Sequence, residues 1–283
     1  MAPDPIDAAA QLLSEAESLL ICAGAGMGVD SGLPDFRGTH GFWRAYPALR
    51  DAGIDFHDIA NPAAFDADPL LAWGFYGHRL QLYRETLPHA GFAILRDLAA
   101  SKPGGAFVFT SNVDGQFQRA GFDEDRVVEC HGSIHRLQCT LPCSDATWPA
   151  DGFAPLVDMA ACRLRSPLPG CPRCGAPARP NILMFNDGAW IADRTEAQYE
   201  RLRRWRQADD KPANKLAHKL VVIELGAGVD IPSVRRMSEQ QGVPIVRINP
   251  RAAQLGPHPG VAISFTALAA LQSLHGLINR KQS

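Results

Sequence analysis

The stretch ICAGAGMGVDSGLPDFRG, residues 21–38, decides the fold class. Its apolar run ends in Gly24-Ala25-Gly26, which is typical of a buried parallel strand that leads into a phosphate-binding turn. A dinucleotide-binding loop of the GxGxxG type continues directly into an amphipathic helix. Here two further glycines and a proline follow instead, and then the cluster Asp35-Phe36-Arg37. The stretch therefore predicts a phosphate cradle next to a loop that carries an acid, an aromatic ring and a base.

The same pattern recurs further along the chain. Apolar runs lead into polar or glycine-rich residues at 105–115, 220–228 and 244–250, and helical segments are expected at 69–86, 90–100 and 195–207. Strands that alternate with helices predict an α/β fold with a Rossmann-like, doubly wound parallel sheet. Ligands of such sheets bind beyond the carboxyl ends of the strands. We therefore expect the polar strand ends to lie close together in space.

Two regions interrupt the alternation. Residues 35–68 are rich in Gly, Pro, Asp and aromatic residues and predict loops and short helices, within an insertion at about 39–90. Residues 136–180 are rich in Cys, Pro and Arg and show little periodicity, which predicts a small inserted module. We therefore expect a Rossmann-like domain made of residues 1–135 and 181–283, and a separate module of residues 136–180.

The overall composition is that of an ordinary globular protein. The chain has 283 residues, of which 46% are apolar and 20% charged, so it can bury a stable core without disulfide cross-links. A formal net charge of -2 gives no reason to expect binding to nucleic acid or to a membrane surface. No apolar run reaches the roughly 18 residues of a membrane span. The first residues carry acids and lack a basic region, so we expect no signal peptide and a cytoplasmic protein.

Four of the seven cysteines form two close pairs, Cys139 with Cys143 and Cys171 with Cys174. Two such pairs in a chain without an export signal predict a structural Zn²⁺ site of four thiolates. The module has few apolar residues, so the metal would supply much of its folding energy. Cys162 is an alternative ligand, because the spacing of the first pair is less regular. We expect Cys22 and Cys130, which lie in strand-like contexts, to be core residues.

Candidate catalytic side chains follow two of the apolar runs. Asn112 and Asp114 lie in TSNVD, and His131 follows the run RVVEC and precedes Gly132. A neutral imidazole with a pKa of about 6.5 can act as a general base at cellular pH. A lone histidine is more often structural than catalytic, so these residues alone leave both roles of His131 open.

Taken in order, these segments resemble the sirtuin family of NAD-dependent protein-lysine deacylases. The resemblance covers about residues 15–265 and includes the first stretch up to Gly38, the TSNVD segment, His131-Gly132, the cysteine pairs and ARPNILMFND at 178–187. GAG at 226–228 corresponds to the G-T-S loop of the family, and Ile248-Asn249 to its I-N motif. The first motif and the cysteine pairs are specific individually, and the ordered set is very specific.

The resemblance implies NAD as a co-substrate that is consumed. It assigns cofactor binding to Gly24, Ala25, Gly26, Asp35, Phe36, Arg37, Ser111, Asn112, Asp114, Gly226, Ala227, Gly228 and Asn249. His131 would be the general base, Asn112 would position the ribose or a water, and Asp114 would bind the nicotinamide amide. The acyl oxygen of an acyl-lysine would displace nicotinamide, and free lysine and O-acyl-ADP-ribose would result. The partners would be proteins that carry acyl-lysine, and their backbone would add as a strand near Ile182, Met184 and Phe185 and near 228–231.

The segment WGFYGHR at 73–79 resembles the sirtuins that remove acidic acyl groups. In that class a Tyr and an Arg three residues apart bind the distal carboxylate of a succinyl or malonyl group. Tyr76 and Arg79 have this spacing and would share one face of a helix. The alternative is that Tyr76 packs in the core and Arg79 is solvated.

Several positions depart from the family pattern. Ser111 replaces a Gln, Gly28 replaces a small polar residue or Ala, and Ala227-Gly228 replaces Thr-Ser. FND replaces F-G-E at 185–187, and Phe92 replaces a family His. None of these changes removes the base or the cysteines, and together they indicate a divergent branch. The alternatives are protein ADP-ribosyl transfer or NAD hydrolysis on the same fold, a binding module without catalysis, and an unrelated zinc-bearing α/β protein.

Overall fold

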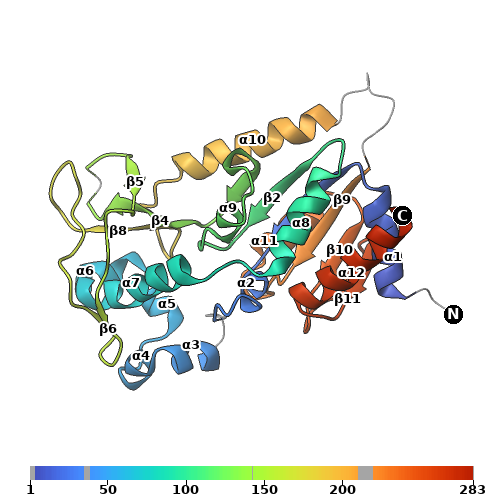
Figure 1. Cartoon of the computed structure of the whole chain (residues 1–283). Coiled ribbons are helices and arrows are strands. Elements are labelled where there is room, and N and C mark those ends of the chain that lie inside the picture. The colour runs from blue at the N-terminus through green and yellow to red at the C-terminus, as the bar shows by residue number, and fades with distance from the viewer. Residues whose placement is uncertain (1–3, 35–38, 142, 210–218, 283) are drawn as a thin grey trace.

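A computed structural model describes residues 4–34, 39–141, 143–209 and 219–282. The predicted loop residues Asp35, Phe36 and Arg37 lie outside these ranges. The central element is a six-stranded sheet with the order β11-β10-β9-β1-β2-β3, and all its strand pairs are parallel (Figure 1). Its strands are β1 (Ser18–Ala23), β2 (Ala106–Thr110), β3 (Val127–Glu129), β9 (Leu220–Leu225), β10 (Ile245–Ile248) and β11 (Gly260–Ile263). The predicted doubly wound parallel sheet is confirmed.

The central strands are buried on both faces, as their apolar sequences predict. Alternate residues of β1 point to opposite sides, so Leu19 and Ile21 join one core while Leu20 and Cys22 join another. The first core includes residues of α1 (Pro5–Glu15), α8 (Ala90–Ala100) and α12 (Ala267–Gln282). The second includes residues of α10 (Asp193–Asp209) and α11 (Ser233–Gln240). Helices therefore cover both faces of the sheet. A ligand can then approach the sheet only at the ends of its strands.

The remaining helices are short, apart from one. They are α2 (Gly26–Val29), α3 (Thr39–Ala45), α4 (Pro47–Asp51), α5 (Phe56–Ile59), α6 (Pro62–Ala67), α7 (Pro69–Glu85), α9 (Gln116–Arg119) and the 3-10 turn η1 (Glu124–Arg126). The predicted short helices before residue 69 and the long helix after it are confirmed. Among the described residues, no helix has the length and apolar character needed to cross a bilayer.

Helix α7 is buried on most of its sides. It begins at Pro69, and the Asp68 side chain caps it by accepting a hydrogen bond from the backbone N–H of Leu71 at 3.1 Å. Its residues Trp73 and Leu80 belong to a third apolar core, which also holds Ile134 of β4 (Gly132–Cys139) in the cysteine-rich region. This third core joins the insertion and the cysteine-rich region, and it positions α7 under the site described below.

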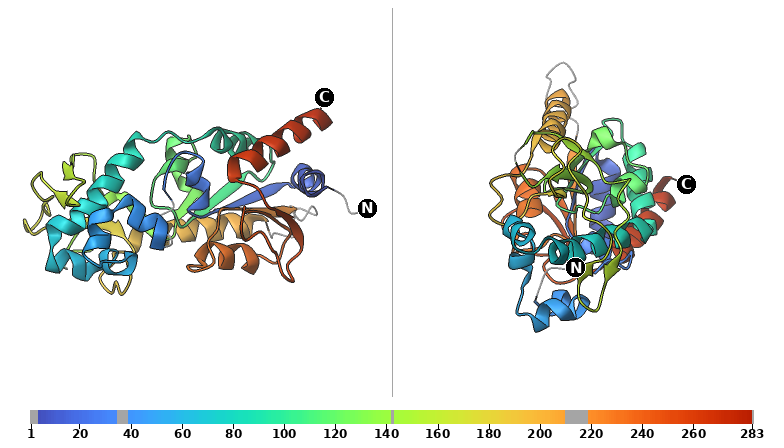
Figure 2. Two further views of the ribbon diagram at one scale, coloured as in Figure 1. Left: turned by 90° about the horizontal axis from the view of Figure 1, so that it is seen from below. Right: turned by 90° about the vertical axis from the view of Figure 1, so that its left-hand side faces the viewer.

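The cysteine-rich region forms two small antiparallel sheets. One has the order β5-β4-β8, with β4 (Gly132–Cys139), β5 (Thr147–Pro149) and β8 (Ala178–Ile182); the other pairs β6 (Val157–Asp158) with β7 (Arg163–Leu164). Figures 1 and 2 place this region at the opposite end of the molecule from α1 and α12. At Gly74 of α7 the region comes very close, since a Cβ there would lie 1.9 Å from the carbonyl oxygen of Cys162. Helix α7 and this region therefore pack backbone against backbone.

Candidate active site

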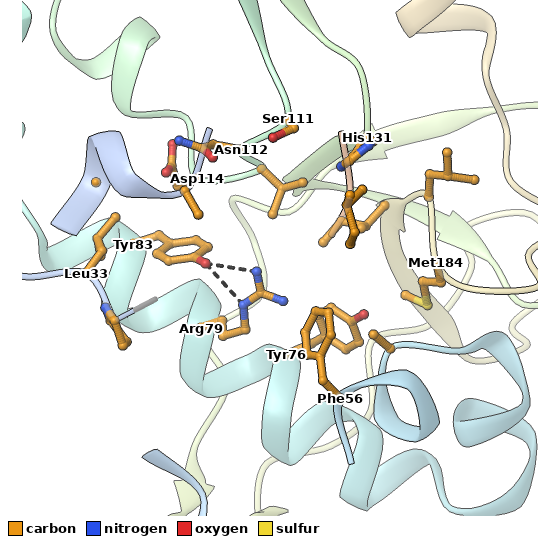
Figure 3. A pocket seen from close by; sticks show the side chains of 18 of the residues that line it. Leu33, Phe56, Tyr76, Arg79, Tyr83, Ser111, Asn112, Asp114, His131 and Met184 are labelled. Carbon is orange, nitrogen blue, oxygen red and sulfur yellow. Dashed lines mark hydrogen bonds between the residues drawn. The ribbon is translucent and has the colours of Figure 1, made fainter. Parts of the chain in front are cut away.

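A cavity of about 250 Å³ lies at the carboxyl ends of β1 and β2, above helix α7 (Figure 3). It is lined by residues that are far apart in the sequence and that belong to the motifs described above. These are Ala25, Gly28, Tyr76, Arg79, Ser111, Asn112, Asp114, His131, Ile182, Met184 and Phe185. The expectation that the polar strand ends meet in space is thereby confirmed for β1 and β2.

The end of β2 is fastened to the glycine turn after β1. The Thr110 hydroxyl donates to the carbonyl oxygen of Ala23 at 3.0 Å and accepts from the backbone N–H of Asn112 at 3.0 Å. The Asn112 side-chain amide donates to the carbonyl oxygen of Gly24 at 3.1 Å. Asn112 is therefore held between the turn and the cavity, with its amide oxygen still available to a ligand.

Asp114 is a buried carboxylate at the wall of the cavity, 8% exposed. Its Oδ1 accepts from the backbone N–H of Gln116 at 2.9 Å. Burial raises its pKa to about 6, and the nearby Glu129 carboxylate adds to this rise. A carboxyl group so poised can accept a hydrogen bond from a bound amide when it is ionised. Gly28 lies beside it, since a Cβ there would be 3.7 Å from Asp114 Oδ2.

His131 follows β3 and is half-buried. Its Nε2 lies 3.1 Å from the hydroxyl oxygen of Ser233, in the first turn of α11. Its backbone carbonyl accepts from the N–H of Leu183 at 3.0 Å, which ties the histidine to the segment after β8. Ser233 was not predicted from the sequence, because no motif or spacing in the chain marks it as a partner of His131.

The glycine turns after β1 and β9 touch through their backbones. The Gly26 N–H donates to the carbonyl oxygen of Gly226 at 3.0 Å. A Cβ at Gly24 would lie 2.7 Å from that same oxygen, and one at Gly226, whose φ is +57°, would lie 2.4 Å from the Gly26 Cα. These positions therefore require glycine, because a side chain at any of them would collide with the backbone of the facing turn.

Tyr76 and Arg79 both line the floor of the cavity (Figure 3). Arg79 is 8% exposed, so the alternative of a solvated Arg79 is wrong, whereas Tyr76 is 1% exposed and packs in the third core as the same alternative expected. Its Nε and Nη2 donate to the Tyr83 hydroxyl at 3.1 and 2.9 Å, and its guanidinium lies 5.1 Å from the Phe75 ring centre. Tyr76 stacks on Phe65, and burial raises its pKa to about 12, so its phenol is neutral at physiological pH. Tyr83 was missed, although its i+4 spacing from Arg79 was a usable signal.

The segment after β8 forms another wall of the cavity. Ile182 and Met184 are buried, whereas Leu183 between them is 39% exposed. The turn that follows is fixed by a buried ion pair in which Arg179 donates to both Asp187 oxygens at 2.8 Å. The alternation of buried and exposed residues is that of a strand edge.

The predicted cofactor residues after β9 and β10 lie outside this cavity, along the same edge of the sheet and on the other side of β1. They are Gly226, Ala227, Gly228 and Asn249. The Asn249 amide donates to the carbonyl oxygen of Ala227 at 2.9 Å, and its Oδ1 accepts from the N–H groups of Arg251 and Ala252 at 3.0 Å each. In this structure the Asn249 side chain joins two loops.

The four predicted cysteines cluster at the end of the module. Their sulfur atoms all lie within 4.8 Å of one another, and Cys139–Cys174 and Cys143–Cys171 are each separated by 3.6 Å. Four thiolates at about 2.3 Å from Zn²⁺ form a tetrahedron with edges of about 3.8 Å, so the cluster can hold a zinc ion.

The other cysteines lie away from this cluster. Cys162 is buried against α7, and Cys22 and Cys130 lie in the core, as expected for the latter two. The backbone N–H groups of Cys174 and Arg173 lower the pKa of Cys171 to about 6, which favours its thiolate form. Gly175 has a φ of +76°, which makes this turn possible.

Known proteins are similar in sequence to this chain over most of its length. The family model described as Sir2 family matches residues 24–205. The chain belongs to the Sir2 family. It is 30% identical over 277 residues to an NAD-dependent protein deacylase of Thermus thermophilus, covering 95% of this chain and 93% of the relative. It is 25% identical over 266 residues to the NAD-dependent protein deacylase of Aquifex aeolicus, covering 93% and 96%.

Solved structures of Sir2 proteins share the fold. A Sir2 homologue in complex with NAD aligns with a TM-score of 0.71 at 24% identity, covering 97% of this chain and 94% of the other. A structure titled Sir2-p53 peptide-NAD+ aligns with a TM-score of 0.66 at 19% identity, covering 96% and 97%. The resemblance to the sirtuins and the prediction of an enzyme from a family of NAD-dependent protein deacylases are confirmed.

Proposed function

We propose that this Sir2 protein removes acyl groups from protein lysines with consumption of NAD, and that it releases nicotinamide and O-acyl-ADP-ribose. The observation that carries the proposal is the meeting of Asn112, Asp114 and His131 at one cavity, next to the glycine turn after β1. The end of β2 supplies an amide and a carboxylate, and the end of β3 supplies an imidazole. These are the groups that binding of a ribose, binding of a carboxamide and proton transfer require.

Each side chain has a distinct task in this proposal. Bound NAD supplies a glycosidic carbon from which nicotinamide departs while the acyl oxygen attaches. The buried Asp114 carboxylate holds the nicotinamide amide, and Asn112 orients the ribose or a water through its amide oxygen. His131 takes a proton from a ribose hydroxyl, an effect worth typically about 10²–10⁴-fold in rate. The Ser233 hydroxyl at 3.1 Å orients the imidazole ring for that transfer.

The substrate peptide would lie in an extended conformation between the segment after β8 and residues 228–231. Support comes from the strand-like alternation at Ile182 to Met184 and from Ile231, which reaches the cavity. Leu183 and Val229 are 39% and 58% exposed, and a bound chain would cover both. The acyl-lysine side chain would then enter the cavity toward α7.

The acyl group preferred by this cavity would be acidic, such as succinyl or malonyl. The Arg79 guanidinium and the neutral Tyr76 phenol line the same floor. A guanidinium and a phenol can bind one carboxylate with charge-assisted hydrogen bonds. Tyr83 would fix the guanidinium plane through its two hydrogen bonds to Arg79.

The cysteine cluster would hold one structural Zn²⁺, bound by Cys139, Cys143, Cys171 and Cys174. We also propose that residues 136–180 fold as a module that depends on this ion, beside a Rossmann-like domain of residues 1–135 and 181–283. Part of this region packs on the third apolar core, and the metal would fix the end that carries the four cysteines.

The test is a product analysis by mass spectrometry. Purified protein is incubated with NAD and with acetyl-, succinyl- and longer acyl-lysine peptides, and His131→Gln serves as the matched inactive variant. We expect deacylated peptide, nicotinamide and O-acyl-ADP-ribose in equal amounts, and a strong dependence of nicotinamide release on the acyl-peptide. ADP-ribosylated protein, or nicotinamide release that needs no acyl-peptide, would contradict the proposal and indicate ADP-ribosyl transfer or NAD hydrolysis.

A further inference from the structure

The imidazole ring of His131 is held from outside its own strand. Strand β3, which precedes it, is the last strand of the sheet and pairs with β2. Contacts reach His131 from two distant parts of the described chain. The N–H of Leu183 donates to its carbonyl oxygen at 3.0 Å, and the Ser233 hydroxyl oxygen lies 3.1 Å from its Nε2. The first contact holds the backbone and the second acts on the ring, so the orientation of the ring depends on what holds Ser233.

Ser233 is the first residue of α11, and this helix lies across the sheet. The helix packs on β9, β1 and β2. Its residue Val234 is buried in the same core as Phe109 of β2 and as Cys130, the neighbour of His131. The eight residues of α11 span about 12 Å, and three neighbouring strands span about 10 Å. Helix α11 therefore extends from the β9 side of the sheet to the proposed base on the other side.

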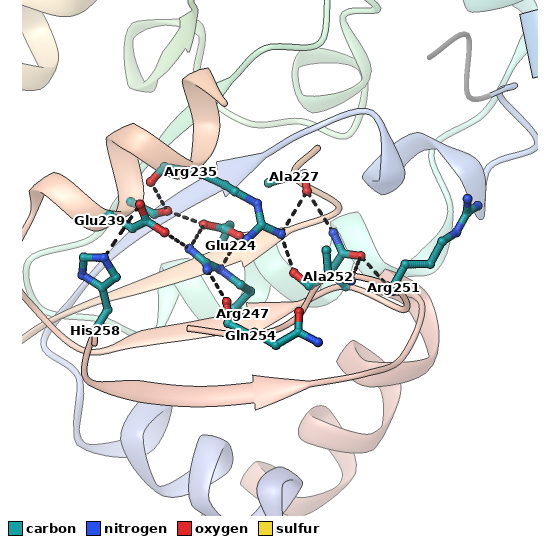
Figure 4. Close-up of polar contacts among 11 residues, drawn as sticks. Glu224, Ala227, Arg235, Glu239, Arg247, Arg251, Ala252, Gln254 and His258 are labelled. Atoms are coloured by element: carbon teal, nitrogen blue, oxygen red, sulfur yellow. Dashed lines mark hydrogen bonds and ion pairs between the residues drawn. The ribbon is translucent and has the colours of Figure 1, made fainter. Parts of the chain in front are cut away.

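The end of α11 that is remote from His131 is fastened by a cluster of buried charges (Figure 4). Arg247 of β10 binds Glu224 of β9, with an Nε–Oε1 distance of 2.6 Å and an Nη2–Oε2 distance of 2.9 Å. From α11, the Ser238 hydroxyl donates to Glu224, and Glu239 Oε1 accepts from Arg247 Nη2 at 2.7 Å. We call Glu224, Ser238, Glu239 and Arg247 the anchor cluster.

The anchor cluster restricts the position of α11 because its central charges are buried. Glu224, Arg247 and Ser238 are all buried, and a charge in such a place is stable only when it is paired and hydrogen-bonded. A shift of α11 would break these pairs. A catalytic group that is misplaced by about 1 Å can lose up to about 10²-fold in rate, even when the cause lies far from the reacting atoms.

We propose that the anchor cluster positions the base, and that α11 and Ser233 connect the two. Ser233 and Glu239 are then positioning residues, and this role rests on the function proposed above. The Ser233 hydroxyl holds the His131 ring in the orientation in which it takes a proton from the ribose hydroxyl. Glu239 holds the helix that carries Ser233. Since both residues act through His131, their loss should lower kcat and leave the KM for NAD and for the acyl-peptide nearly unchanged.

The first measurement is steady-state kinetics of deacylation by the full chain. Ser233→Ala should lower kcat by about 3–10-fold, as expected for one lost hydrogen bond, and Ser233→Thr, which keeps a hydroxyl, should restore most of it. Glu239→Ala should lower kcat by roughly 2–5-fold. Arg236→Ala is the matched control and should leave kcat unchanged, because Arg236 is an exposed charged residue of α11 outside the anchor cluster.

The double variant of Ser233→Ala and Glu239→Ala separates positioning from a general loosening of the fold. If the anchor cluster acts through Ser233, Glu239→Ala should have no further effect on kcat once the Ser233 hydroxyl is absent, so the two losses are not additive. Additive losses, an unchanged kcat in Glu239→Ala, or a rise in KM in place of the fall in kcat would overturn the proposal. Urea titrations show whether each variant is folded. Ser238→Ala, which removes the donor to Glu224, replaces Glu239→Ala if the latter does not fold.

The second measurement needs no turnover. Nitrogen NMR of protein labelled in histidine reports on Nε2 of His131, and the signal is assigned with His131→Gln. Ser233→Ala and Glu239→Ala should shift this signal in the same direction, whereas Arg236→Ala should not shift it. A signal that Glu239→Ala leaves in place overturns the proposal. Absence of deacylation by the unmodified protein contradicts the proposed function alone, and the NMR result then still decides whether the anchor cluster positions His131.

Discussion

The site edge of the sheet has two halves, on either side of β1. The ends of β2 and β3, with Asn112, Asp114 and His131, form the reactive half, and the ends of β9 and β10, with Ala227 and Asn249, form the half where we propose that adenosine binds, called the adenosine half. The two halves differ in how much of the sirtuin pattern they keep. The reactive half has the Asn112, Asp114 and His131 side chains that the family motifs predict, and all three line one cavity. The adenosine half has lost both hydroxyls of the G-T-S loop, and its Asn249 joins loops. Catalysis needs particular side chains at the reacting atoms, whereas binding of a phosphate can be spread over backbone N–H groups. The difference between the two halves shows that this fold tolerates substitutions in the adenosine half more readily than in the reactive half.

Removal of zinc should have the largest effect on activity and should disturb the reactive half but not the adenosine half. Strand β4 begins directly after His131 and ends at Cys139, so unfolding of the module would displace the base. We expect a chelator to abolish deacylation below detection and to leave the affinity for ADP-ribose within a few-fold. Zinc release is followed with a metal-sensitive dye, and binding by calorimetry. Cys162→Ala, in the same region but outside the cluster, is the control and should retain zinc. Full activity of the zinc-free protein would contradict the proposed role of the metal.

His131→Gln should lower kcat by about 10²–10⁴-fold, because the general base is lost while a hydrogen bond to Ser233 can persist. The dissociation constant for ADP-ribose should change little, since the adenosine half is untouched. Single-turnover rates and calorimetry measure the two quantities. A parallel loss of binding would mean that the halves are not separable.

Arg79→Met should lower desuccinylation by about 10–100-fold and leave deacetylation within a few-fold, because only the succinyl group carries a charge for the guanidinium to bind. Tyr83→Phe, which keeps the ring but removes the hydroxyl that holds Arg79, should give a smaller loss with the same selectivity. The measurement is kcat/KM on matched succinyl and acetyl peptides. Equal losses on both peptides would remove the carboxylate-binding role of Arg79.

Asp114→Asn should have the smallest effect of these changes, and the effect should be a pH-dependent change in the free energy of unfolding. Burial raises the pKa of Asp114 to about 6, from 3.8, so the group favours the folded state when protonated. Its contribution is fully present below pH 3.8 and is lost as the pH rises through about 6. We expect the variant to gain on the order of 2 kcal/mol in free energy of unfolding at about pH 8 and almost nothing at about pH 4. Urea titrations at both pH values measure this, and a less stable variant at the higher pH would contradict it.

Much of the fold could be predicted because its strands are short apolar runs that end in polar residues or glycine. The strand expected before Gly24-Ala25-Gly26 and the helix expected at 90–100 match β1 and α8 closely. Because β1 is buried on both faces, its sequence has no polar alternation that could mislead. The residues of the reactive half were found because they follow such strands.

Contacts that depend on tertiary packing could not be predicted. Ser233 reaches His131 across 102 positions of sequence, and no local pattern encodes that approach. The bridging role of Asn249 depends on how the loops after β9 and β10 meet, which strand periodicity does not specify. Tyr83 is different, because its spacing from Arg79 on a helix placed both on one face and was overlooked.

The close approach of Gly74 to Cys162 has a consequence for attempts to recombine Sir2 proteins. Any side chain at residue 74 would collide with the backbone of the cysteine-rich region, so the two surfaces must be exchanged together. A chimera that receives the cysteine-rich region of another Sir2 protein should therefore also receive that protein's counterpart of helix 69–85. Only then would the two surfaces fit, and only then would the chimera have the acyl preference of the donor.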